Sequence, residues 1–311
     1  MEKGSAESVS TRSGPDLRGV TLRVGDQFNL GKTLLEVSGE AEDAPYDIEW
    51  SPFAAGPPML EAISAGAIDL GQTGDAPPIF AQSAGAPIKI VGVAAGRKPG
   101  QSHLSILVPK DSPVQTVADL KGKKVAFAQG SGAHWLVLAA LEKASLKAGD
   151  IQPVYLLPAD GLAAFNGGSI DAWAVWDPFL TLGEQQSGRT ITTGAGLIGG
   201  FLFQVARVGA LDDPKLEAAI GDYLHRVSRA ATWAVTHKDV WAEHYAKITK
   251  LPAAVVASTL DRFELTYFPI DRSVVEAQQS EADAFAAAGL IPKAIDINEV
   301  FDFRYAAAPP G

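Results

Sequence analysis

Two loops that contain glycine could bind an anion through uncharged donors. In the first loop, Thr73, Gly74 and Asp75 follow a short apolar stretch and precede Pro77 and Pro78. A strand, a tight loop and the start of a helix therefore follow one another, and this arrangement directs backbone N–H groups and a helix dipole toward an anion. Similar turns occur in α/β proteins without any ligand, so a purely structural role stays open.

The second loop, residues 129–134, repeats this arrangement after a predicted strand at 125–128. Ser131 can cap the following helix or donate its hydroxyl, and Gly132 allows the backbone to approach a ligand. His134 would stay neutral near a helix N-terminus and could donate one N–H. The alternative for His134 is a solvated surface residue.

A third candidate lies at the end of a predicted strand. Trp176 shares a strand face with the small residues Ala172 and Ala174. Ligands in open α/β sheets lie beyond the carboxyl ends of the strands, so Trp176 is expected to form an apolar wall over an alkyl or aryl tail. Interdomain packing is the alternative for Trp176. Asp177, which precedes Pro178, is expected to cap a helix rather than to contact the ligand.

Strands alternate with helices around these loops. Strands are predicted at 20–25, 46–50, 68–71, 88–93, 103–108, 125–128, 154–157, 171–176 and 201–208, with helices at 57–66, 77–85, 133–146 and 161–166. The apolar run 88–93 is typical of a strand buried on both faces of a parallel sheet. Asp213 and Asp271 are expected to cap helices, and the C-terminal part of the chain is predicted to be helical.

The apolar strands 103–108 and 201–208 bracket a central α/β unit, so the chain would leave one domain, build a second and return. This pattern predicts an α/β fold of the two-lobe, type II periplasmic binding protein kind, with two hinge crossings and a ligand cleft between the lobes. The predicted divisions are a disordered tail at 1–16, a discontinuous lobe 1 at 17–107 plus 207–311, and a lobe 2 at 108–206.

The composition excludes several classes of function. The net charge is −10, with 36 acidic against 26 basic residues, which opposes binding to nucleic acid and anionic lipid. The absence of cysteine excludes disulfides, thiolate nucleophiles and cysteine zinc sites. The five histidines lack metal-ligand spacing, and GxSxG and HExxH motifs are absent. We therefore expect no catalytic residues, no metal and no cofactor.

The sequence resembles the aliphatic sulfonate-binding proteins that serve ABC transporters. The resemblance is carried by residues 53–86, 117–127, 151–165, 171–178, 251–260 and 290–297. It implies an extracytoplasmic, monomeric receptor, periplasmic or lipid-anchored, that delivers a small anionic sulfonate to permease subunits for sulfur acquisition. Residues 1–16 show no apolar signal-peptide core. Two departures are the poor match at 29–44 and Gln129, where members of the family often carry lysine.

The resemblance and the loops together predict a ligand site. The head group would be held by Thr73, Gly74, Ser131, Gly132 and His134, the tail would be lined by Gln27, Phe28 and Trp176, and Gly56, Asp75 and Asp177 complete the predicted set. Asp75 would repel a sulfonate, so it is expected to cap the helix at Pro77 unless it meets a ligand amine, as in taurine.

Two alternatives stay open at this point, and a third is disfavoured. The same fold could bind taurine, nitrate or a thiamine-pyrimidine precursor. It could also serve as a ligand sensor for a membrane signalling partner. The fold resembles desulfinases and thiamine-pyrimidine synthases as well, but those enzymes depend on a cysteine that this sequence lacks.

Overall fold

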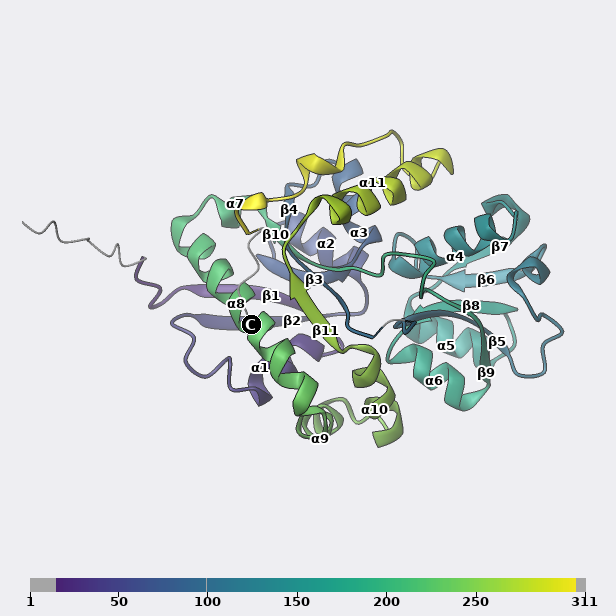
Figure 1. Cartoon of the computed structure of the whole chain (residues 1–311), viewed down its shortest axis with the longest axis horizontal. Helices are drawn as coiled ribbons and strands as arrows, with labels where there is room; N and C mark the ends of the chain where they lie inside the picture. The colour runs from purple at the N-terminus through teal and green to yellow at the C-terminus, as the bar shows by residue number, and fades with distance from the viewer. Residues whose placement is uncertain (1–14, 99, 306–311) are drawn as a thin grey trace, which may run out of the picture.

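The computed structural model describes residues 15–98 and 100–305. Two lobes, each built on one β-sheet, lie side by side and are joined by two crossing segments (Figure 1). Apart from residues 15 and 16, the tail predicted at 1–16 lies outside the described residues. Within the described ranges, no helix has both the length and the apolar character needed to cross a membrane.

The larger lobe contains a six-stranded sheet in the order β11-β4-β10-β3-β1-β2. Its strands are β1 (Thr21–Gln27), β2 (Asp47–Phe53), β3 (Leu70–Gly74), β4 (Ile88–Gly96), β10 (Leu202–Arg207) and β11 (Leu265–Phe268). The pairs β1–β2 and β1–β3 are parallel, whereas β10 and β11 run antiparallel to their neighbours.

The strand predicted at 88–93 is confirmed as β4, but its assignment to a parallel sheet is wrong. Both of its neighbours, β10 and β11, run antiparallel to it. Ile90 packs in the core on one face of the sheet and Val91 in the core on the other. The continuous apolar run therefore reports burial on two faces, and a mixed sheet covered by helices on both sides requires the same run.

Helices cover both faces of the large sheet. One face is covered by α2 (Gly56–Ser64), α3 (Ala76–Ser83) and α11 (Arg272–Ala287), and the other by α1 (Leu30–Val37), α7 (Val208–Leu211) and α8 (Pro214–Thr236), with α9 (Lys238–Thr249) and α10 (Ala253–Arg262) packed outside. The predicted caps are confirmed, because the Asp213 and Asp271 carboxylates accept N–H groups in the first turns of α8 and α11.

The smaller lobe contains a five-stranded sheet in the order β7-β6-β8-β5-β9. Its strands are β5 (Leu104–Pro109), β6 (Lys124–Phe127), β7 (Gln152–Tyr155), β8 (Ala172–Trp176) and β9 (Gly188–Thr193). One face carries α4 (Gly132–Lys143), and the other carries α5 (Pro158–Asn166) and α6 (Phe179–Gln186). Strand β5 runs antiparallel to both of its neighbours.

The crossings fall earlier than the predicted boundaries at 107 and 206. Strand β5 pairs with β8 and β9 in the smaller lobe, and β10 inserts between β3 and β4 in the larger lobe. The chain therefore crosses at about 97–103 and 194–201, before each strand. An apolar strand beside a crossing has the same composition in either sheet, so the sequence did not reveal its partner. The prediction of helix alone in the C-terminal part is wrong at β11.

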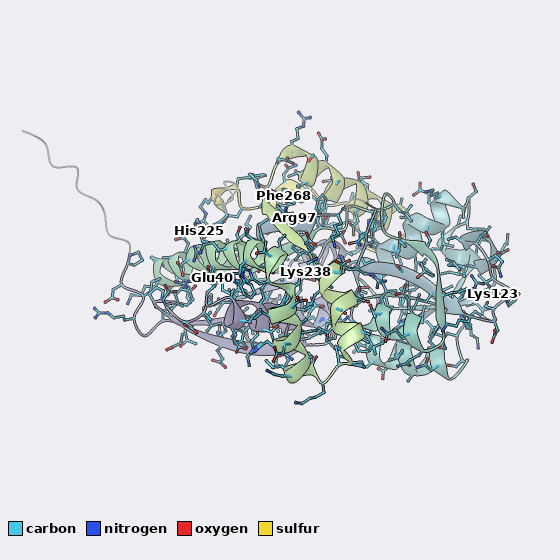
Figure 2. The ribbon with its side chains drawn as sticks, turned by 60° about the horizontal axis from the view of Figure 1, so that its bottom comes forward. Glu40, Arg97, Lys123, His225, Lys238 and Phe268 are labelled. Carbon is cyan, nitrogen blue, oxygen red and sulfur yellow. The ribbon has the colours of Figure 1, made fainter. Side chains whose placement is uncertain are left out.

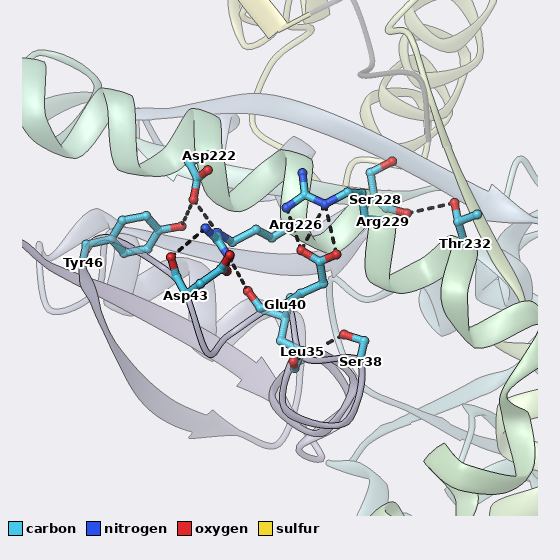
Figure 3. A network of polar contacts seen from close by, with 10 residues as sticks. All are labelled: Leu35, Ser38, Glu40, Asp43, Tyr46, Asp222, Arg226, Ser228, Arg229 and Thr232. Atoms are coloured by element: carbon cyan, nitrogen blue, oxygen red, sulfur yellow. Dashed lines mark hydrogen bonds and ion pairs between the residues drawn. The ribbon is translucent and has the colours of Figure 1, made fainter. Parts of the chain in front are cut away.

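A charged network fixes the loop after α1 to helix α8 (Figure 3). The buried Arg226 guanidinium donates to Asp43 Oδ1 at 2.6 Å and to Asp222 Oδ2 at 2.5 Å. The Tyr46 hydroxyl also donates to Asp222, and Arg229 pairs with Glu40. These contacts hold the start of β2, and with it the edge of the large sheet, against α8.

A second ionic group anchors the first crossing. Lys98 and Lys238 both contact Asp261 and Glu264, and the Lys238 Nζ lies 2.5 Å from Glu264 Oε2. Figure 2 shows Lys238 and Arg97 in the middle of the molecule, whereas Lys123 lies at the far end of the smaller lobe. The crossing is therefore tied to the α10–β11 region of the larger lobe.

Candidate functional site

A cleft between the two lobes brings most of the predicted residues together. Its empty space measures about 610 Å³, including solvent at the mouth, and it is lined by Gln27, Phe28, Leu30, Gly56, Gln72, Thr73, Gly74, Pro77, His103, Leu104, Ser131, Gly132, Trp176, Asp177, Leu202 and Phe263. Every predicted site residue belongs to this lining except Asp75 and His134, which are buried outside it.

Strand direction explains why these residues meet. The parallel strands β1, β3, β6 and β8 deliver residues that lie at or just beyond their carboxyl ends. The reversed strands β5 and β10 begin at the same edges, so Leu104 and Leu202 reach the cleft from strand starts. The cleft therefore lies at the position expected for ligands of open α/β sheets.

In the larger lobe, Gly56 and Thr73 form a close contact. A Cβ on Gly56 would lie 2.0 Å from Thr73 Oγ1, so only glycine fits at the start of α2. Thr73 is 1% exposed, and its hydroxyl has no hydrogen-bond partner within the described residues. This wall therefore offers the Thr73 hydroxyl, and the Gly56 N–H, which has no acceptor within α2, as uncharged donors.

The start of α3 offers few donors, contrary to the interpretation of the first loop. Asp75 Oδ1 accepts the Ala76 N–H at 3.1 Å, and Pro77 and Pro78 have no N–H. The prediction that Asp75 caps this helix is confirmed. Burial raises the pKa of Asp75 to about 6, because a low-dielectric environment disfavours the charged carboxylate.

In the smaller lobe, the start of α4 keeps free backbone donors. Ser131 Oγ accepts the His134 N–H at 3.4 Å, and its hydroxyl donates to the Ala128 carbonyl at 2.7 Å. The serine is therefore a helix cap whose hydrogen is already used. The N–H groups of Gly132 and Ala133, in the first turn, have no acceptor within the helix and lie at its positive dipole end.

Gly132 allows the two lobes to approach closely. A Cβ at this position would lie 3.3 Å from Asp75 Oδ1 and 3.4 Å from Leu104 Cδ1. The start of α4 therefore stands directly beside the buried carboxyl of the larger lobe, which would repel an anion bound there whenever Asp75 is ionised.

His134 lies in the apolar contact between the lobes rather than in the cleft lining. It is 2% exposed, and its ring stacks between Phe127 and Phe80, with centroids 4.8 and 6.1 Å away. Its Nδ1 accepts the Gly130 N–H at 3.2 Å. Burial lowers its pKa to about 4, so the ring is neutral at pH 7. A first-turn residue faces either the cleft or the neighbouring lobe, and the sequence did not distinguish these directions.

Asp177 connects the lobes. Pro178, not Asp177 as predicted, holds the N-cap position of α6, but the fully buried Asp177 carboxylate accepts the Thr181 N–H in the first turn at 3.1 Å. The carboxylate also lies 3.2 Å from Arg262 Nη1 of α10. Arg262 also pairs with Glu184 at 2.7 Å. A guanidinium of the larger lobe is therefore held by two carboxylates of the smaller lobe.

The apolar part of the cleft is aromatic. Phe28, with φ at +58°, packs edge-on against Phe179 of the smaller lobe at 5.5 Å between ring centroids. Trp176 ends β8 on the opposite side. Gln27, also predicted for the tail, donates through Nε2 to the Gln72 carbonyl at 2.9 Å.

The cleft has little formal charge. Among the described residues that line it, Asp177 alone carries a formal charge, and that charge is paired with Arg262. Gln129 is exposed and lies outside the lining, so the exchange of lysine for glutamine leaves the walls unchanged. Across residues 15–98 and 100–305, no group of three or more potential ligand side chains could hold a metal ion.

Comparisons with known proteins identify the family of this chain. Residues 41–190 match the family model described as "ABC transporter, phosphonate, periplasmic substrate-binding protein". Over 301 residues, the chain is 42% identical to a putative aliphatic sulfonates-binding protein of Escherichia coli K12, covering 95% of this chain and 91% of that protein. The chain belongs to the aliphatic sulfonate-binding protein family.

Solved structures of the aliphatic sulfonate-binding family have the same two-lobe fold. The alkanesulfonate-binding protein of Xanthomonas axonopodis pv. citri, solved with MOPS bound, aligns with a TM-score of 0.84 at 36% identity, over 93% of this chain and 99% of that one. The periplasmic aliphatic sulphonate-binding protein of E. coli aligns at 0.78 and 40% identity, over 96% and 94%. The predicted family, fold and role as an ABC-transporter solute-binding component, not an enzyme, are confirmed.

Several lining residues of this family member were not predicted from the sequence. His103 stands at the first crossing, and burial together with the Arg262 charge lowers its pKa to about 4, so it is a neutral polar group at pH 7. Phe263 packs 5.1 Å from His103, between ring centroids, at the end of α10. A histidine directly before an apolar strand was the available signal for His103; Phe263 has no local signal, because only the tertiary fold brings α10 to the cleft.

Proposed function

We propose that the cleft binds a sulfonate by its head group, mainly at the start of α4, and releases it unchanged to an ABC permease. A sulfonate is permanently ionised and has three acceptor oxygens and no proton, so its site needs donors only. The uncommitted donors at the two walls are the N–H groups of Gly56, Gly132 and Ala133 and the buried Thr73 hydroxyl. The proposal rests on the buried Thr73 hydroxyl, which has no partner within the described residues and lines the same cleft as the start of α4.

Uncharged donors suit reversible capture. Removing a lysine or arginine from water costs several kcal/mol and offsets much of its attraction for the anion. Helix N-H groups are already oriented and partly desolvated, so they stabilise the anion at a smaller cost. Asp177 does not oppose the anion strongly, because Arg262 neutralises it.

The ligand tail would lie against Phe28 and Trp176, with Leu202 and Phe263 completing an apolar surface. Transfer of apolar tail area from water to this surface adds affinity at roughly 25 cal/mol per Å². We therefore propose alkane- or arylsulfonates as the ligand class.

Delivery to a permease and a periplasmic location are part of the same proposal. They are supported by family membership and by the E. coli relative, whose structure is described as periplasmic. We propose that the receptor acts as a monomer, with one cleft per chain.

A thermal-unfolding panel tests the ligand class. Butanesulfonate at about 100 times its Kd is expected to stabilise the protein by roughly 2.7 kcal/mol, which raises the Tm by about 4 °C for a chain of 311 residues. Butylammonium, with the same chain and the opposite charge, is the matched control and should give no shift.

Taurine, nitrate, sulfate and a thiamine-pyrimidine precursor complete the panel. A shift with any of these, without a shift for butanesulfonate or benzenesulfonate, would contradict the proposal. A larger shift for taurine than for ethanesulfonate would assign Asp75 or Asp177 to a ligand ammonium instead.

A further inference from the structure

A second cavity lies in the larger lobe beside the cleft. It is lined by Leu30, Gly31, Leu34, Gln72, Gln204, Tyr223, Val227, Ala231, Ala234, Trp241, Phe263, Leu265 and Tyr267. Leu30, Gln72 and Phe263 line the cleft as well, so the two spaces adjoin at these three residues. We call the second cavity the lobe 1 chamber.

The walls of the lobe 1 chamber are almost entirely apolar. Val227, Ala231 and Ala234 recur at helical spacing on one face of α8 and are each less than a tenth exposed. The Trp241 indole N–H is used by Thr33 Oγ1 at 3.1 Å. The Tyr267 hydroxyl oxygen accepts from Gln72 and Gln204, at 2.6 and 3.0 Å.

One polar atom of the chamber is unsatisfied. Gln204 is 2% exposed, and its Oε1 has no hydrogen-bond partner within the described residues. A lining that lacks contact atoms on one side costs stability. A hydrocarbon in the chamber would restore these contacts and would leave the Gln204 acceptor unpaired. Small residues on α8 keep the space open, because Ala231 and Ala234 occupy positions where longer apolar side chains would fill it.

We infer that the lobe 1 chamber receives the far end of the ligand's apolar tail, which passes Leu30, Gln72 and Phe263 from the cleft. The ligand class is therefore a sulfonate with an extended unbranched hydrocarbon chain, longer than the cleft alone can cover. This inference rests on the proposed function, because it requires the head group to be held at the start of α4.

Calorimetric titration with a series of linear alkanesulfonates, from ethane- to decanesulfonate, tests the inference. Each methylene that enters the chamber is expected to tighten binding about fourfold. The wild-type protein should therefore bind decanesulfonate far more tightly than butanesulfonate.

Ala231→Leu fills the chamber from α8 and leaves the cleft lining intact. It is expected to weaken decanesulfonate binding at least about tenfold, the loss of two or more methylenes, while ethanesulfonate changes less than twofold. Thr232→Leu, at the next and exposed position of the same helix, is the matched control and should behave as wild type.

Val227→Ala enlarges the same chamber. It provides a second test if the leucine of Ala231→Leu prevents folding. It should move the tightest-binding chain length upward by at least one carbon. The inference is overturned if wild-type affinity stops rising at butanesulfonate, or if Ala231→Leu changes ethane- and decanesulfonate by the same factor. Failure of the proposed function is separate, since ethanesulfonate would then not bind the wild-type protein at all.

Discussion

The two walls of the cleft use the same sequence pattern in different ways. Each wall has a strand, a short loop and a helix start. In the larger lobe, Asp75 and two prolines occupy the start of α3, and the free donors are the Thr73 hydroxyl and the Gly56 N–H at the start of α2. In the smaller lobe, Ser131 caps α4 through its side chain, and the N–H groups of Gly132 and Ala133 stay available.

This difference shows that the capping residue decides whether a helix start can bind an anion. A carboxylate cap brings its own negative charge and takes a donor, whereas a serine cap is neutral. The larger lobe would then supply a fixed hydroxyl, one amide and apolar surface, and the smaller lobe the two adjacent amides of Gly132 and Ala133. The predictions below test this division in order of expected effect.

Gly132→Pro should cause the largest loss of affinity. Proline removes the N–H but is favoured at the first helical position, and Ser131 before it already has the extended backbone that proline requires, with φ −99° and ψ 169°. Loss of a hydrogen bond to an anion should weaken butanesulfonate binding about 10- to 100-fold. Gly132→Ala retains the N–H and is the control. Equal losses of affinity in the two variants would show that the Gly132 N–H does not bind the sulfonate.

Thr73→Val should weaken sulfonate binding about tenfold while the unliganded protein is unchanged or up to about 1 kcal/mol more stable. The hydroxyl has no partner in the described structure and is desolvated, so an isosteric methyl removes an unfavourable group. Chemical denaturation and calorimetry measure the two effects. A loss of stability with unchanged affinity would place the hydroxyl outside the ligand contacts.

Asp75→Asn should remove a pH dependence of binding. Because the pKa of Asp75 is raised to about 6, the carboxyl is neutral at pH 5 and charged at pH 8. Wild-type affinity for butanesulfonate should therefore fall roughly threefold or more as the pH rises through 6, through repulsion at short range. The asparagine variant, which can still cap α3, should bind equally at both pH values.

The same carboxyl affects stability with a defined sign. Its pKa in the folded protein lies above the unfolded value of about 3.9, so its contribution is complete below pH 4 and is lost as the pH rises through 6. The wild-type Tm should fall more steeply over this range than the Tm of Asp75→Asn. An identical slope for both proteins would contradict the assigned shift.

Ser131→Ala should have the smallest effect on affinity, less than about threefold, although it removes the most conspicuous hydroxyl at the site. Its hydrogen is donated to Ala128 and its oxygen caps α4, so the expected loss is about 1 kcal/mol of stability. A tenfold loss of affinity would show that the hydroxyl rotates to the ligand.

The sequence predicted most of the cleft because that part is local. Prolines, glycines and apolar runs around Thr73 and Ser131 define their strands and helices within about ten residues, and they reach the cleft as expected. Strand order was not predictable in the same way. The sheet that accepts β5 or β10 is chosen by long-range packing, and a short apolar strand carries no information on direction.

Other elements were missed because their local signals are weak or absent. Helix α1 begins after Phe28 and Asn29, both with positive φ, and Asn29 makes no side-chain cap. Strand β11 has four residues and lies at a sheet edge, so partial exposure hides its pattern. The hydrogen bonds of Ser131 depend on Ala128 and His134, which lie nearby in the chain. The direction of the His134 ring depends on Phe80 of the opposite lobe. Residue type alone specifies neither.

The Arg262 contact with Asp177 and Glu184 has a consequence for selectivity. Arg262 and Glu184 lie outside the cleft lining, and Asp177 belongs to it. For ligands that do not contact Asp177, the free energy of this contact therefore adds equally to every complex and cancels from any ratio of dissociation constants. Changing this contact would alter residence times for all such cargoes by one common factor and leave their rank order intact.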